Sequence, residues 1–368
     1  MKQGWEIKKI KDICSKASSN IAQNKITELD GDYPVFGASG FVQNIDFYHQ
    51  DTEYIGIVKD GSGVGRVNKY PAYSSLLGTL QYILPKEGYD LNYVGYALQS
   101  LNLAKYASGA AIPHIYFRDY GEETICVPPL TEQKRIVEIL DREFEKIDAL
   151  KENAEKNLQH AKDLFQSALK QELQPKEGWI TMQIGNVCEL KQGLAINAKT
   201  KYLLVEKSNL PLLRIKDLKD GTREMFVNES ECPQGCRAYP EDIIYTRTGT
   251  LGLVFTGAYG VMHNNCFKIE IDKEKIDKHY LMYYLQQDSF RSNIVKLASR
   301  AAQPDITHKL FKEQIIHFPA IAEQVAIKHK LSDVREHCQD IEENYKKTIA
   351  LCDDMKQALL RKAFNGEL

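Results

Sequence analysis

The sequence predicts an α+β protein with a pseudo-two-fold internal repeat, in which two globular domains alternate with two long helices. Residues 131–174 and 320–368 are long runs without proline, as expected of helices. The two runs match each other at a constant offset of 191 residues. The regions before them, 1–130 and 175–319, contain short apolar runs bounded by Gly, Asp and Pro, which is the pattern of strands.

The run 131–174 carries the seam of a helix that packs along its whole length on another helix. Nine of eleven positions in its two heptad columns are apolar: Leu140, Ile147, Ala154, Ala161 and Ala168, then Val137, Phe144, Lys151, Leu158, Phe165 and Glu172. Thr131 is the expected N-cap, and Glu132 lies near the positive end of the helix dipole. About 42 residues would form a rod of roughly 60 Å, which requires a partner helix.

The run 320–368 supplies that partner. Its seam is Leu331, Val334, Cys338, Ile341, Tyr345, Cys352, Met355 and Leu359. The same offset aligns Glu132-Gln133 with Glu323-Gln324 and Leu169-Lys170 with Leu360-Arg361. Because the register holds over about forty residues, we interpret the two runs as a duplication.

The two globular regions repeat as well. Gly4-Trp5 and Gly178-Trp179 open them at a shorter offset of 174 residues. We predict strands at Tyr54–Val58, Gln81–Leu84, Ile243–Tyr245 and Phe267–Ile271, and helices at Leu91–Tyr106 and Lys278–Leu297.

Composition excludes several classes of protein. The chain has 368 residues, is 43% hydrophobic and 27% charged, and has a net charge of −2. No apolar run approaches the length of a membrane span, and the first residues lack the apolar core of a signal peptide. Eight scattered cysteines favour a reducing, cytoplasmic compartment. Any attraction to DNA must come from local basic patches, because the net charge is slightly negative.

Each half has a glycine-rich turn after a predicted strand, at 59–66 and at 247–252. Neither turn has the spacing of a dinucleotide or Walker phosphate loop, so we expect tight hairpins. The turns place polar and basic side chains on convex tips that suit a DNA groove: Lys59, Ser62 and Arg66 in the first, and Arg247, Thr248 and Thr250 in the second.

Other loops have residue types that read base edges. They include Tyr73-Ser74-Ser75, matched with His263-Asn264-Asn265, and a proline-containing loop that repeats at the offset of 191 as Ala110–Ile115 and Ala301–Ile306. The candidate contacts in and around the repeated loops are His114, Arg300, Gln303 and Lys309. Solvated loops have the same composition, so the pattern leaves both interpretations open.

Catalytic and metal-binding patterns are missing from the sequence. Cys232 and Cys236 lie in Cys-Pro-Gln-Gly-Cys, but a zinc site needs a second ligand pair, and only His263 and Cys266 lie nearby in sequence. We therefore expect no metal. The sequence has no Asn-Pro-Pro-Tyr-type methylase motif, nucleophile elbow or nuclease carboxylate cluster. These absences favour a binding or scaffold protein over an enzyme.

Several motifs resemble the specificity subunit of type I restriction–modification systems, over essentially the whole chain. The most specific are Pro-Leu-Thr-Glu-Gln-Lys-Arg-Ile before the first long helix, its repeat around Glu323-Gln324, and the ending Leu-Leu-Arg-Lys-Ala-Phe-Asn-Gly-Glu-Leu. The stretches 33–40, 213–218 and 242–249 also resemble the target-recognition domains of that family. One departure is Ala322, which stands where the first copy has Thr131.

The resemblance implies that each globular domain reads one half of a bipartite, asymmetric DNA site. The long helices would lie antiparallel, set the spacer between the half-sites and dock two methylation subunits, with Glu132, Gln133, Glu323 and Gln324 expected at the docking sites. The methylation subunits would bring S-adenosylmethionine, and motor-nuclease subunits would join for cleavage. The chain itself would then bind no cofactor and catalyse no reaction.

Two alternatives come from other classes. One is a scaffold that binds only proteins through two domains on a helical spacer. The other is a self-contained methyltransferase, which the missing motifs disfavour.

Overall fold

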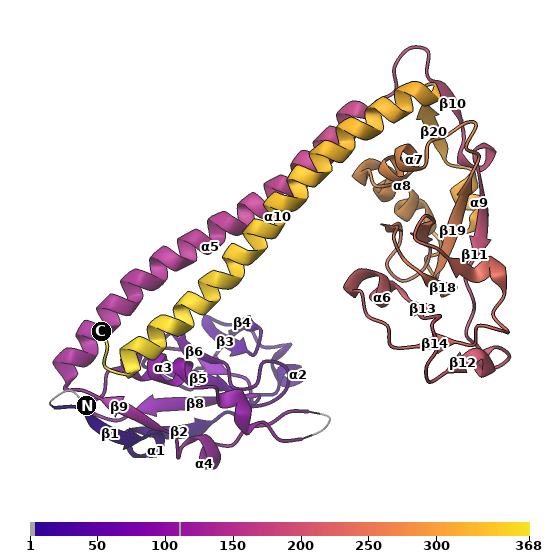
Figure 1. The fold of residues 1–368 in the computed structure, drawn as a ribbon. Coiled ribbons are helices and arrows are strands. Elements are labelled where there is room, and N and C mark those ends of the chain that lie inside the picture. The colour runs from indigo at the N-terminus through magenta and orange to yellow at the C-terminus, as the bar shows by residue number, and fades with distance from the viewer. Residues whose placement is uncertain (1–3, 110–111) are drawn as a thin grey trace. The chain divides into compact units, whose positions relative to one another are not determined.

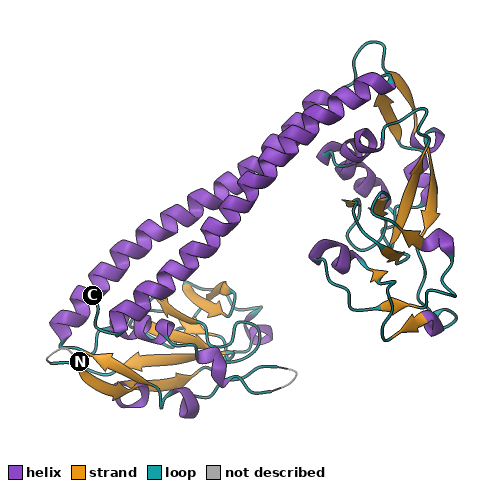
Figure 2. Ribbon diagram, in the orientation of Figure 1, coloured by secondary structure: helices purple, strands orange, loops and turns teal. Residues whose placement is uncertain are grey.

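The computed structural model describes residues 4–109 and 112–368, and these form two compact units. Unit 1 comprises Met1–Glu155 and Lys346–Leu368, and unit 2 comprises Lys156–Tyr345. Two long helices, α5 (Leu130–Glu172) and α10 (Ile321–Phe364), run through both units (Figures 1 and 2). The alternation of α+β domains with long helices confirms the predicted fold class, and each unit is described by itself below.

Unit 1 is built on two small sheets and a strand pair. Its elements are β1 (Glu6–Lys9), α1 (Ile10–Ile13), β2 (Cys14–Ser18), α2 (Gln23–Ile26), β3 (Tyr33–Gly37), β4 (Gly40–Ile45), β5 (Tyr54–Val58), β6 (Val67–Tyr70), β7 (Ser75–Leu76), β8 (Leu80–Pro85), α3 (Leu91–Ser100), a 3-10 turn (Leu103–Tyr106), α4 (Phe117–Tyr120) and β9 (Thr124–Val127). The strand orders are β2-β8-β5-β6, β4-β3-β7 and β1-β9.

Unit 2 repeats this plan. Its elements are β10 (Ile180–Gln183), a 3-10 turn (Ile184–Asn186), β11 (Cys188–Gln192), a 3-10 turn (Lys201–Leu203), β12 (Leu204–Val205), β13 (Leu212–Leu213), α6 (Ile215–Asp220), β14 (Phe226–Val227), a 3-10 turn (Gln234–Cys236), β15 (Arg237–Ala238), β16 (Ile243–Thr246), β17 (Val254–Phe255), β18 (Gly260–Met262), β19 (Cys266–Ile271), α7 (Lys278–Leu285), α8 (Asp288–Ala298), α9 (His308–Lys312) and β20 (Ile315–Phe318). The order β11-β19-β16-β17 corresponds to β2-β8-β5-β6, and β10-β20 corresponds to β1-β9.

The predicted strands agree with β5, β8, β16 and β19 to within a residue or two at each end. The predicted helix Leu91–Tyr106 is broken in the structure, because Leu101 adopts an extended conformation that ends α3. The predicted helix Lys278–Leu297 is likewise divided, because Gln287 is extended between α7 and α8. Hydrophobic periodicity identified both segments but not the breaks within them.

The long helices are antiparallel in both units. In unit 1, Lys151 pairs with Asp353 at 2.7 Å and Asp148 pairs with Lys356 at 2.5 Å. Residue numbers therefore rise along one helix as they fall along the other. In unit 2, Glu172 pairs with Lys330 at 3.5 Å. The 43 residues of α5 give it a length of about 65 Å.

The predicted N-cap of the first long helix was wrong by two residues. Helix α5 begins at Leu130, and the carbonyl of Pro129 accepts from the N–H groups of Glu132 and Gln133. The carbonyl of Ala320 accepts in the same way from Glu323 and Gln324 at the start of α10. Thr131 therefore lies inside the helix, and the absence of a threonine at Ala322 has no capping consequence.

The predicted seam is largely buried, and its exceptions lie on α10. Along α5, no seam residue is exposed. On α10, Leu331, Cys338 and Cys352 are fully buried, but Ile341 and Met355 are 38% and 47% exposed. Leu360 and Ala363 are buried near the end of α10, because they pack into the core of unit 1 and not only onto α5.

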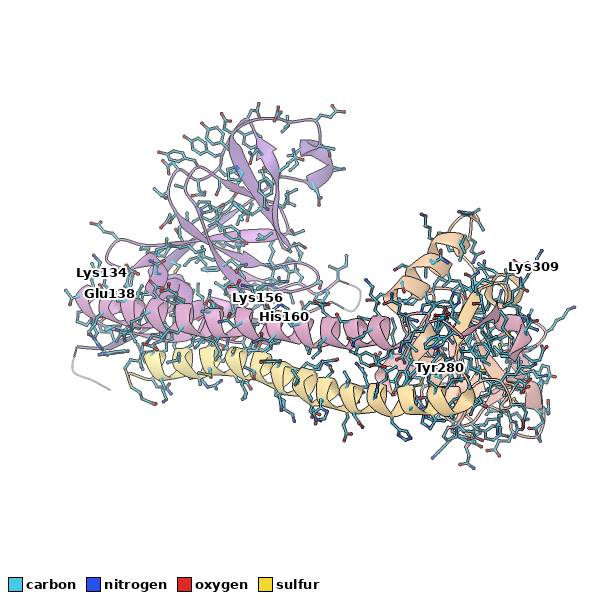
Figure 3. The ribbon with its side chains drawn as sticks, turned by 90° about the horizontal axis from the view of Figure 1, so that it is seen from above. Lys134, Glu138, Lys156, His160, Tyr280 and Lys309 are labelled. Carbon is cyan, nitrogen blue, oxygen red and sulfur yellow. The ribbon has the colours of Figure 1, made fainter. Side chains whose placement is uncertain are left out.

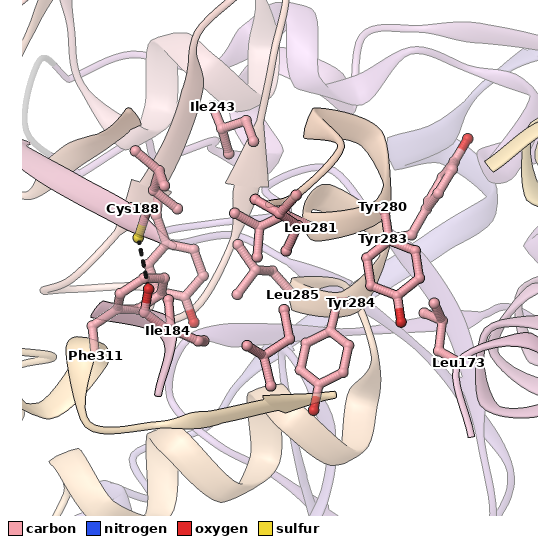
Figure 4. Close-up of a cluster of buried hydrophobic side chains, with 14 of the residues drawn as sticks. Leu173, Ile184, Cys188, Ile243, Tyr280, Leu281, Tyr283, Tyr284, Leu285 and Phe311 are labelled. Atoms are coloured by element: carbon pink, nitrogen blue, oxygen red, sulfur yellow. Dashed lines mark hydrogen bonds between the residues drawn. The ribbon is translucent and has the colours of Figure 1, made fainter. Parts of the chain in front are cut away.

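Each unit encloses its own hydrophobic core, and the long helices contribute to it. Phe165 and Leu169 of α5, and Leu173 just after it, pack with the α7 aromatics and β-sheet residues of unit 2. Figure 4 shows Leu173 with the α7 tyrosines of this cluster. In the same cluster Cys188 Sγ donates to the carbonyl of Ile184 at 3.4 Å. No helix in the part of the chain that the structure describes is long and apolar enough to cross a membrane.

Candidate nucleic-acid interface

In unit 1 the glycine-rich turn meets two other loops. The turn connects β5 and β6, which pair antiparallel, so it is the expected hairpin. The N–H groups of Lys59 and Asp60 donate to the carbonyl of Thr79 at 3.0 and 3.2 Å, and the carbonyl of Lys59 accepts from Ile115 at 3.0 Å. These bonds hold the segments 59–66, 77–79 and 113–115 together as one loop cluster.

Glycine is required at two positions of this turn. Gly63 and Gly65 have φ values of 86° and 85°, a region that side chains disfavour. A Cβ atom on Gly65 would lie 2.6 Å from the backbone nitrogen of Ala104, so any larger residue would push the turn off the segment after α3. The segment after α3 thus fixes one side of the turn, and the tip of the turn is exposed to solvent.

Unit 2 has a loop cluster closed by the same three hydrogen bonds. The N–H groups of Arg247 and Thr248 donate to the carbonyl of Asn265 at 2.8 and 3.4 Å, and the carbonyl of Arg247 accepts from Ile306 at 2.9 Å. Segments 247–252, 263–265 and 304–306 are therefore the counterparts of the three loops in unit 1. The shared backbone pattern shows one scaffold used twice.

The side chains on the two scaffolds differ. In unit 1, the ring of His114 contacts the carboxylate of Asp60 and lies 4.1 Å from the ring of Tyr116. In unit 2, Asp305 binds the guanidinium of Arg247 through two hydrogen bonds, that to Nε being 2.8 Å, and Gln192 accepts from the same guanidinium at 2.9 Å. The two clusters thus present different chemistry on matched backbones.

These contacts change the role expected for Arg247. Only 21% of its side chain is exposed, and three of its hydrogen bonds are already made within the chain. Arg247 joins the three loops of unit 2, and at most part of its guanidinium is left to bind a ligand. Sequence reasoning missed Asp60, Gln192 and Asp305, because their importance depends on contacts with residues distant in the chain.

Several predicted residues do reach the surface. Ser62 and Arg66 are exposed on the turn of unit 1, and Thr248 and Thr250 are half-buried on the turn of unit 2. The side chain of Lys309 is 84% exposed on α9, whereas Tyr280 of the same unit is fully buried (Figure 3). Arg300 and Gln303 are also exposed, between α8 and α9. Lys59 is less accessible, with 21% of its side chain exposed and Asp60 at 4.0 Å.

The prediction for Ser74 and Ser75 was wrong. Both are fully buried. Their hydroxyl groups are used inside the chain: Ser74 Oγ bonds with Tyr54 and the carbonyl of Pro71, and Ser75 Oγ accepts from His49 N–H. The true counterpart of 263–265 is 77–79, because both segments lead into the central strands β8 and β19. Tyr73 is 54% exposed but lies outside the loop cluster. Ala110 and Ala111, in the predicted repeat, lie outside the described residues.

His263, Asn264 and Asn265 are half-buried and serve mainly as backbone partners. A Cβ atom on Gly193 would lie 2.3 Å from the carbonyl oxygen of His263, so β11 approaches this loop closely. Burial lowers the pKa of His263 below its ordinary value, and the side chain of Asn265 opposes that shift. Burial therefore favours the neutral form of the imidazole.

No metal site forms around the cysteine pair. Among residues 4–109 and 112–368, no group of three or more His, Cys, Asp or Glu side chains is arranged to hold a metal ion. Cys232 packs in one apolar cluster and Cys266 in another, which separates the candidate ligands. Burial raises the pKa of Cys266 to about 12.

The expected docking glutamines are internal. Gln133 and Gln324 are 1% and 0% exposed, and each clamps its own globular region to the start of a long helix. Gln133 bonds with Asp90 N–H and the carbonyl of Pro128, both at 2.9 Å. Their neighbours are more accessible: Glu132 pairs with Arg135 at 2.7 Å, and Glu323 accepts from Trp179 at 3.3 Å.

A different set of helix residues is exposed in both copies. Leu130 and Ile321, Leu150 and Ile341, and Leu164 and Met355 are three pairs related by the offset of 191, and all six are 36–55% exposed. Unit 1 therefore exposes Leu130, Leu150 and Met355, and unit 2 exposes the equivalent residues Ile321, Ile341 and Leu164. In unit 1, Leu150 and Met355 border a groove of about 430 Å³ between α5 and α10.

Two matched loop clusters, each on its own α+β unit and joined by paired helices, define an internally duplicated α+β protein. The model of the type I restriction modification DNA specificity domain matches residues 2–160 and 176–351. The chain belongs to this family.

Individual relatives agree with the family match. The chain is 23% identical to the EcoKI specificity subunit of Escherichia coli over 310 residues, which cover 76% of this chain but 65% of that protein. It is 22% identical to the MjaVIII specificity subunit of Methanocaldococcus jannaschii, over 95% of this chain and 92% of that one. Thus the chain spans a little under two thirds of the EcoKI subunit's length.

One solved structure has the same fold over the full length. It comes from work on complex assembly and conformational transition of the type I R-M system, and covers 100% of this chain with a TM-score of 0.74 at 18% identity.

Proposed function

We propose that this chain is the DNA-specificity subunit of a type I restriction–modification complex, in which each unit reads one half of a bipartite, asymmetric site. One observation carries the proposal: the same three-loop scaffold occurs once in each unit but holds different side chains. A duplicated scaffold gives each unit the same way of meeting a duplex. Different side chains on it give two different half-sites.

The exposed residues on each cluster supply the first contacts. Ser62 and Arg66 on the turn of unit 1, and Arg300, Gln303 and Lys309 beside the loop cluster of unit 2, are exposed to phosphates or base edges. Lys309 makes a surface ion pair with Glu313 at 3.8 Å, which a phosphate would displace. The net charge of −2 means that these local groups, and not a global field, provide the attraction. Arg247, held by Asp305, positions the loops of unit 2 and has little of its guanidinium left for a base.

The long helices set the distance between the half-sites in this proposal. Both are continuous, with 43 and 44 residues, and neither contains proline or glycine that would bend it. A stiff helix pair is suited to a fixed spacer, whereas a flexible linker would allow a range of spacings.

The duplicated apolar surface on the helices fits two copies of one partner. The six exposed residues described above form equivalent sets in the two units, so one methylation subunit would bind each set. Those subunits would supply S-adenosylmethionine and methyl transfer, and motor-nuclease subunits would join for cleavage. In this arrangement the chain itself recognises DNA and catalyses no reaction in the cytoplasm.

Duplex binding by the complex with methylation subunits tests the proposal. Lys309→Ala and Arg66→Ala should each weaken binding and reduce the dependence of log K on log salt by about one unit. Lys273→Ala is the matched control, because Lys273 is exposed just beyond the end of β19 opposite the loop cluster. Equal effects of Lys309→Ala and Lys273→Ala would favour the protein-scaffold alternative.

A further inference from the structure

Unit 1 has an open hollow directly beside its loop cluster. Residues 20–23, 37–42 and 77–79 line this space of about 740 Å³, which we call the hollow. Segment 77–79 is also one of the three loops of the cluster, because the carbonyl of Thr79 accepts from the N–H groups of Lys59 and Asp60. The hollow therefore continues the surface that is proposed to meet DNA.

The hairpin of β3 and β4 forms one wall of the hollow. The two strands pair as far as Gly37 and Gly40, so the turn between them has only two residues. Gly40 has a φ of 108°, a region that favours glycine. A Cβ atom on Gly37 would lie 3.1 Å from Cδ1 of Leu77, so glycine at this position lets the hairpin lie close to segment 77–79. The tip of the hairpin is thus held next to the loop cluster.

The hollow has an apolar interior and an exposed aromatic ring. Ile21 and Leu77, which belong to its lining, are buried with 6% and 7% of their surface exposed. Phe41 also belongs to the lining, but 62% of it is exposed. Its ring lies edge to face with that of Phe36, with the centroids 6.3 Å apart. A large apolar ring is therefore presented to a ligand at a place that already has an apolar base.

The lining, all of it within the described residues, contains no charged side chain. Its exposed polar side chains are the amides of Asn20 and Gln23 and the hydroxyls of Ser39 and Thr79. The hollow thus has no cation to attract a phosphate. Amides and apolar groups are instead the side chains that read an A·T pair, because an amide bonds the edge of adenine and an apolar group contacts the methyl of thymine.

Unit 2 has a different group at the equivalent place. The carbonyl of Phe36 accepts from Leu77 N–H at 2.8 Å, and the carbonyl of Leu213 accepts from His263 N–H at 3.1 Å, which matches the two backbones. The next residue is a glycine in unit 1 but Arg214 in unit 2. The guanidinium of Arg214 forms two hydrogen bonds with a carboxylate of α6, at 2.7 and 2.9 Å. The neutral, open surface is therefore a property of unit 1.

We propose that the hollow takes the C5-methyl group of a thymine, so that the half-site read by unit 1 contains an A·T pair at a fixed position. This inference rests on the proposed function and names a base that the proposed function leaves open. Phe41 and the apolar lining enclose the methyl group, and the amides of Asn20 and Gln23 supply contacts for the adenine of the same pair. Burial of one methyl group corresponds to about fourfold in affinity.

Uracil substitution in the duplex tests this proposal. The complex with methylation subunits is offered the bipartite site that it selects, and each thymine of both half-sites is replaced in turn by uracil, which lacks only the C5-methyl group. Competition binding followed by fluorescence anisotropy measures each affinity. We expect uracil at one position to weaken binding about fourfold. Phe41→Ala should remove that difference, so that the thymine and uracil duplexes bind equally.

Phe47→Ala is the matched control, because Phe47 is a phenylalanine of unit 1 that is 38% exposed but lies outside the lining. It should leave the fourfold difference unchanged. Loss of the difference in both variants would overturn the proposal.

The other outcomes separate this inference from the proposed function. A bipartite site whose uracil duplexes all bind as tightly as the parent would overturn the role of the hollow and leave the proposed function intact. If Phe41→Ala weakened binding to the thymine and uracil duplexes equally, its ring would contact DNA without reading the methyl group, and the inference would be wrong. Methylation subunits lost from the Phe41→Ala complex, with the fourfold difference retained, would assign the ring to a protein partner instead. The absence of any bipartite site would overturn both proposals.

Discussion

Gln324 accepts a hydrogen bond from the backbone N–H of Asp277 at 2.7 Å and so fastens α7 to the start of α10. Its amide nitrogen donates to the carbonyls of Pro319 and Lys275 at 2.8 and 3.0 Å. Gln133 makes the equivalent bond to Asp90 at the start of α3. Each glutamine thus joins a globular domain to its helix.

Removing this amide leaves buried backbone groups without partners. Gln324→Ala should lower the free energy of unfolding of unit 2 by about 2–4 kcal/mol, from several unsatisfied groups and a small cavity. Chemical denaturation followed by circular dichroism measures this change. Gln339→Ala, at an exposed position of α10, is the control. A loss no larger than that of the control would contradict the clamp.

The glutamines also show how far the sequence could lead. The repeat at the offset of 191 correctly identified Gln133 and Gln324 as equivalent. It could not reveal that they point inward, because their partners are backbone groups of Asp90 and Asp277, more than forty residues away in each case. Equivalence is visible in a sequence, whereas the direction of a side chain depends on packing.

The helix pair has a cation–aromatic contact in each unit. Lys356 lies 5.1 Å from the ring of Phe144 in unit 1, and Arg335 lies 4.7 Å from the ring of Phe165 in unit 2. The offset of 191 relates Phe144 to Arg335 and Phe165 to Lys356. The position that holds the ring in one unit is therefore equivalent to the position that holds the cation in the other. A double-mutant cycle with Phe144→Leu and Lys356→Met should give a coupling of about 0.5–1 kcal/mol. Additive effects would show that the contact contributes nothing.

Arg247 and Asp305 should act as one group in unit 2. Asp305→Asn keeps the size of the side chain but removes the charge that holds the guanidinium. We expect it to disturb recognition of one half-site and leave the other unchanged, as read by sequencing the duplexes that the complex selects. Asp340→Asn, at an exposed position of α10 in unit 2, is the control, and altered preference at both half-sites would be inconsistent with separate clusters.

Stability should fall on acidification below about pH 6.5. Burial lowers the pKa of His263 and of His308 from the ordinary value of 6.5, so the unfolded chain binds protons more readily than the folded one in this range. Stability contributed by the neutral rings is therefore present above pH 6.5 and is lost as the pH falls toward the folded pKa values.

Melting temperatures at pH 7.5 and 5.5 measure that dependence. His263→Gln should reduce the difference between the two temperatures, because a non-titrating amide replaces the imidazole. His160→Gln, at an exposed position of α5, should leave the difference unchanged. If both variants behaved alike, His263 would not be one of the groups responsible.

The helices should determine the spacer. Seven residues inserted after Glu155 and seven after Tyr345 preserve the heptad phase and the contacts inside each unit. Seven residues add about 10 Å of helix, so the unread gap should lengthen by about three base pairs with both half-sites retained. A changed half-site, with no change in the gap, would contradict the spacer role.

The loop clusters show a second limit of sequence reasoning. The glycine turns and strands were found from local patterns, because turn geometry and alternation depend on neighbouring residues. Ser74 and Ser75 were misplaced because their composition matched that of surface loops, although both are fully buried and Ser75 begins β7. The equivalence of 77–79 with 263–265 is revealed by the strand order and by the hydrogen bond from Lys59 N–H to the carbonyl of Thr79.

Selection from a random pool of duplexes by the complex with methylation subunits, followed by sequencing, tests the central claim most directly. The account predicts two short, different conserved segments separated by an unread gap of fixed length. A single continuous motif, or no enrichment at salt low enough to preserve phosphate contacts, would contradict the assignment of one half-site to each unit.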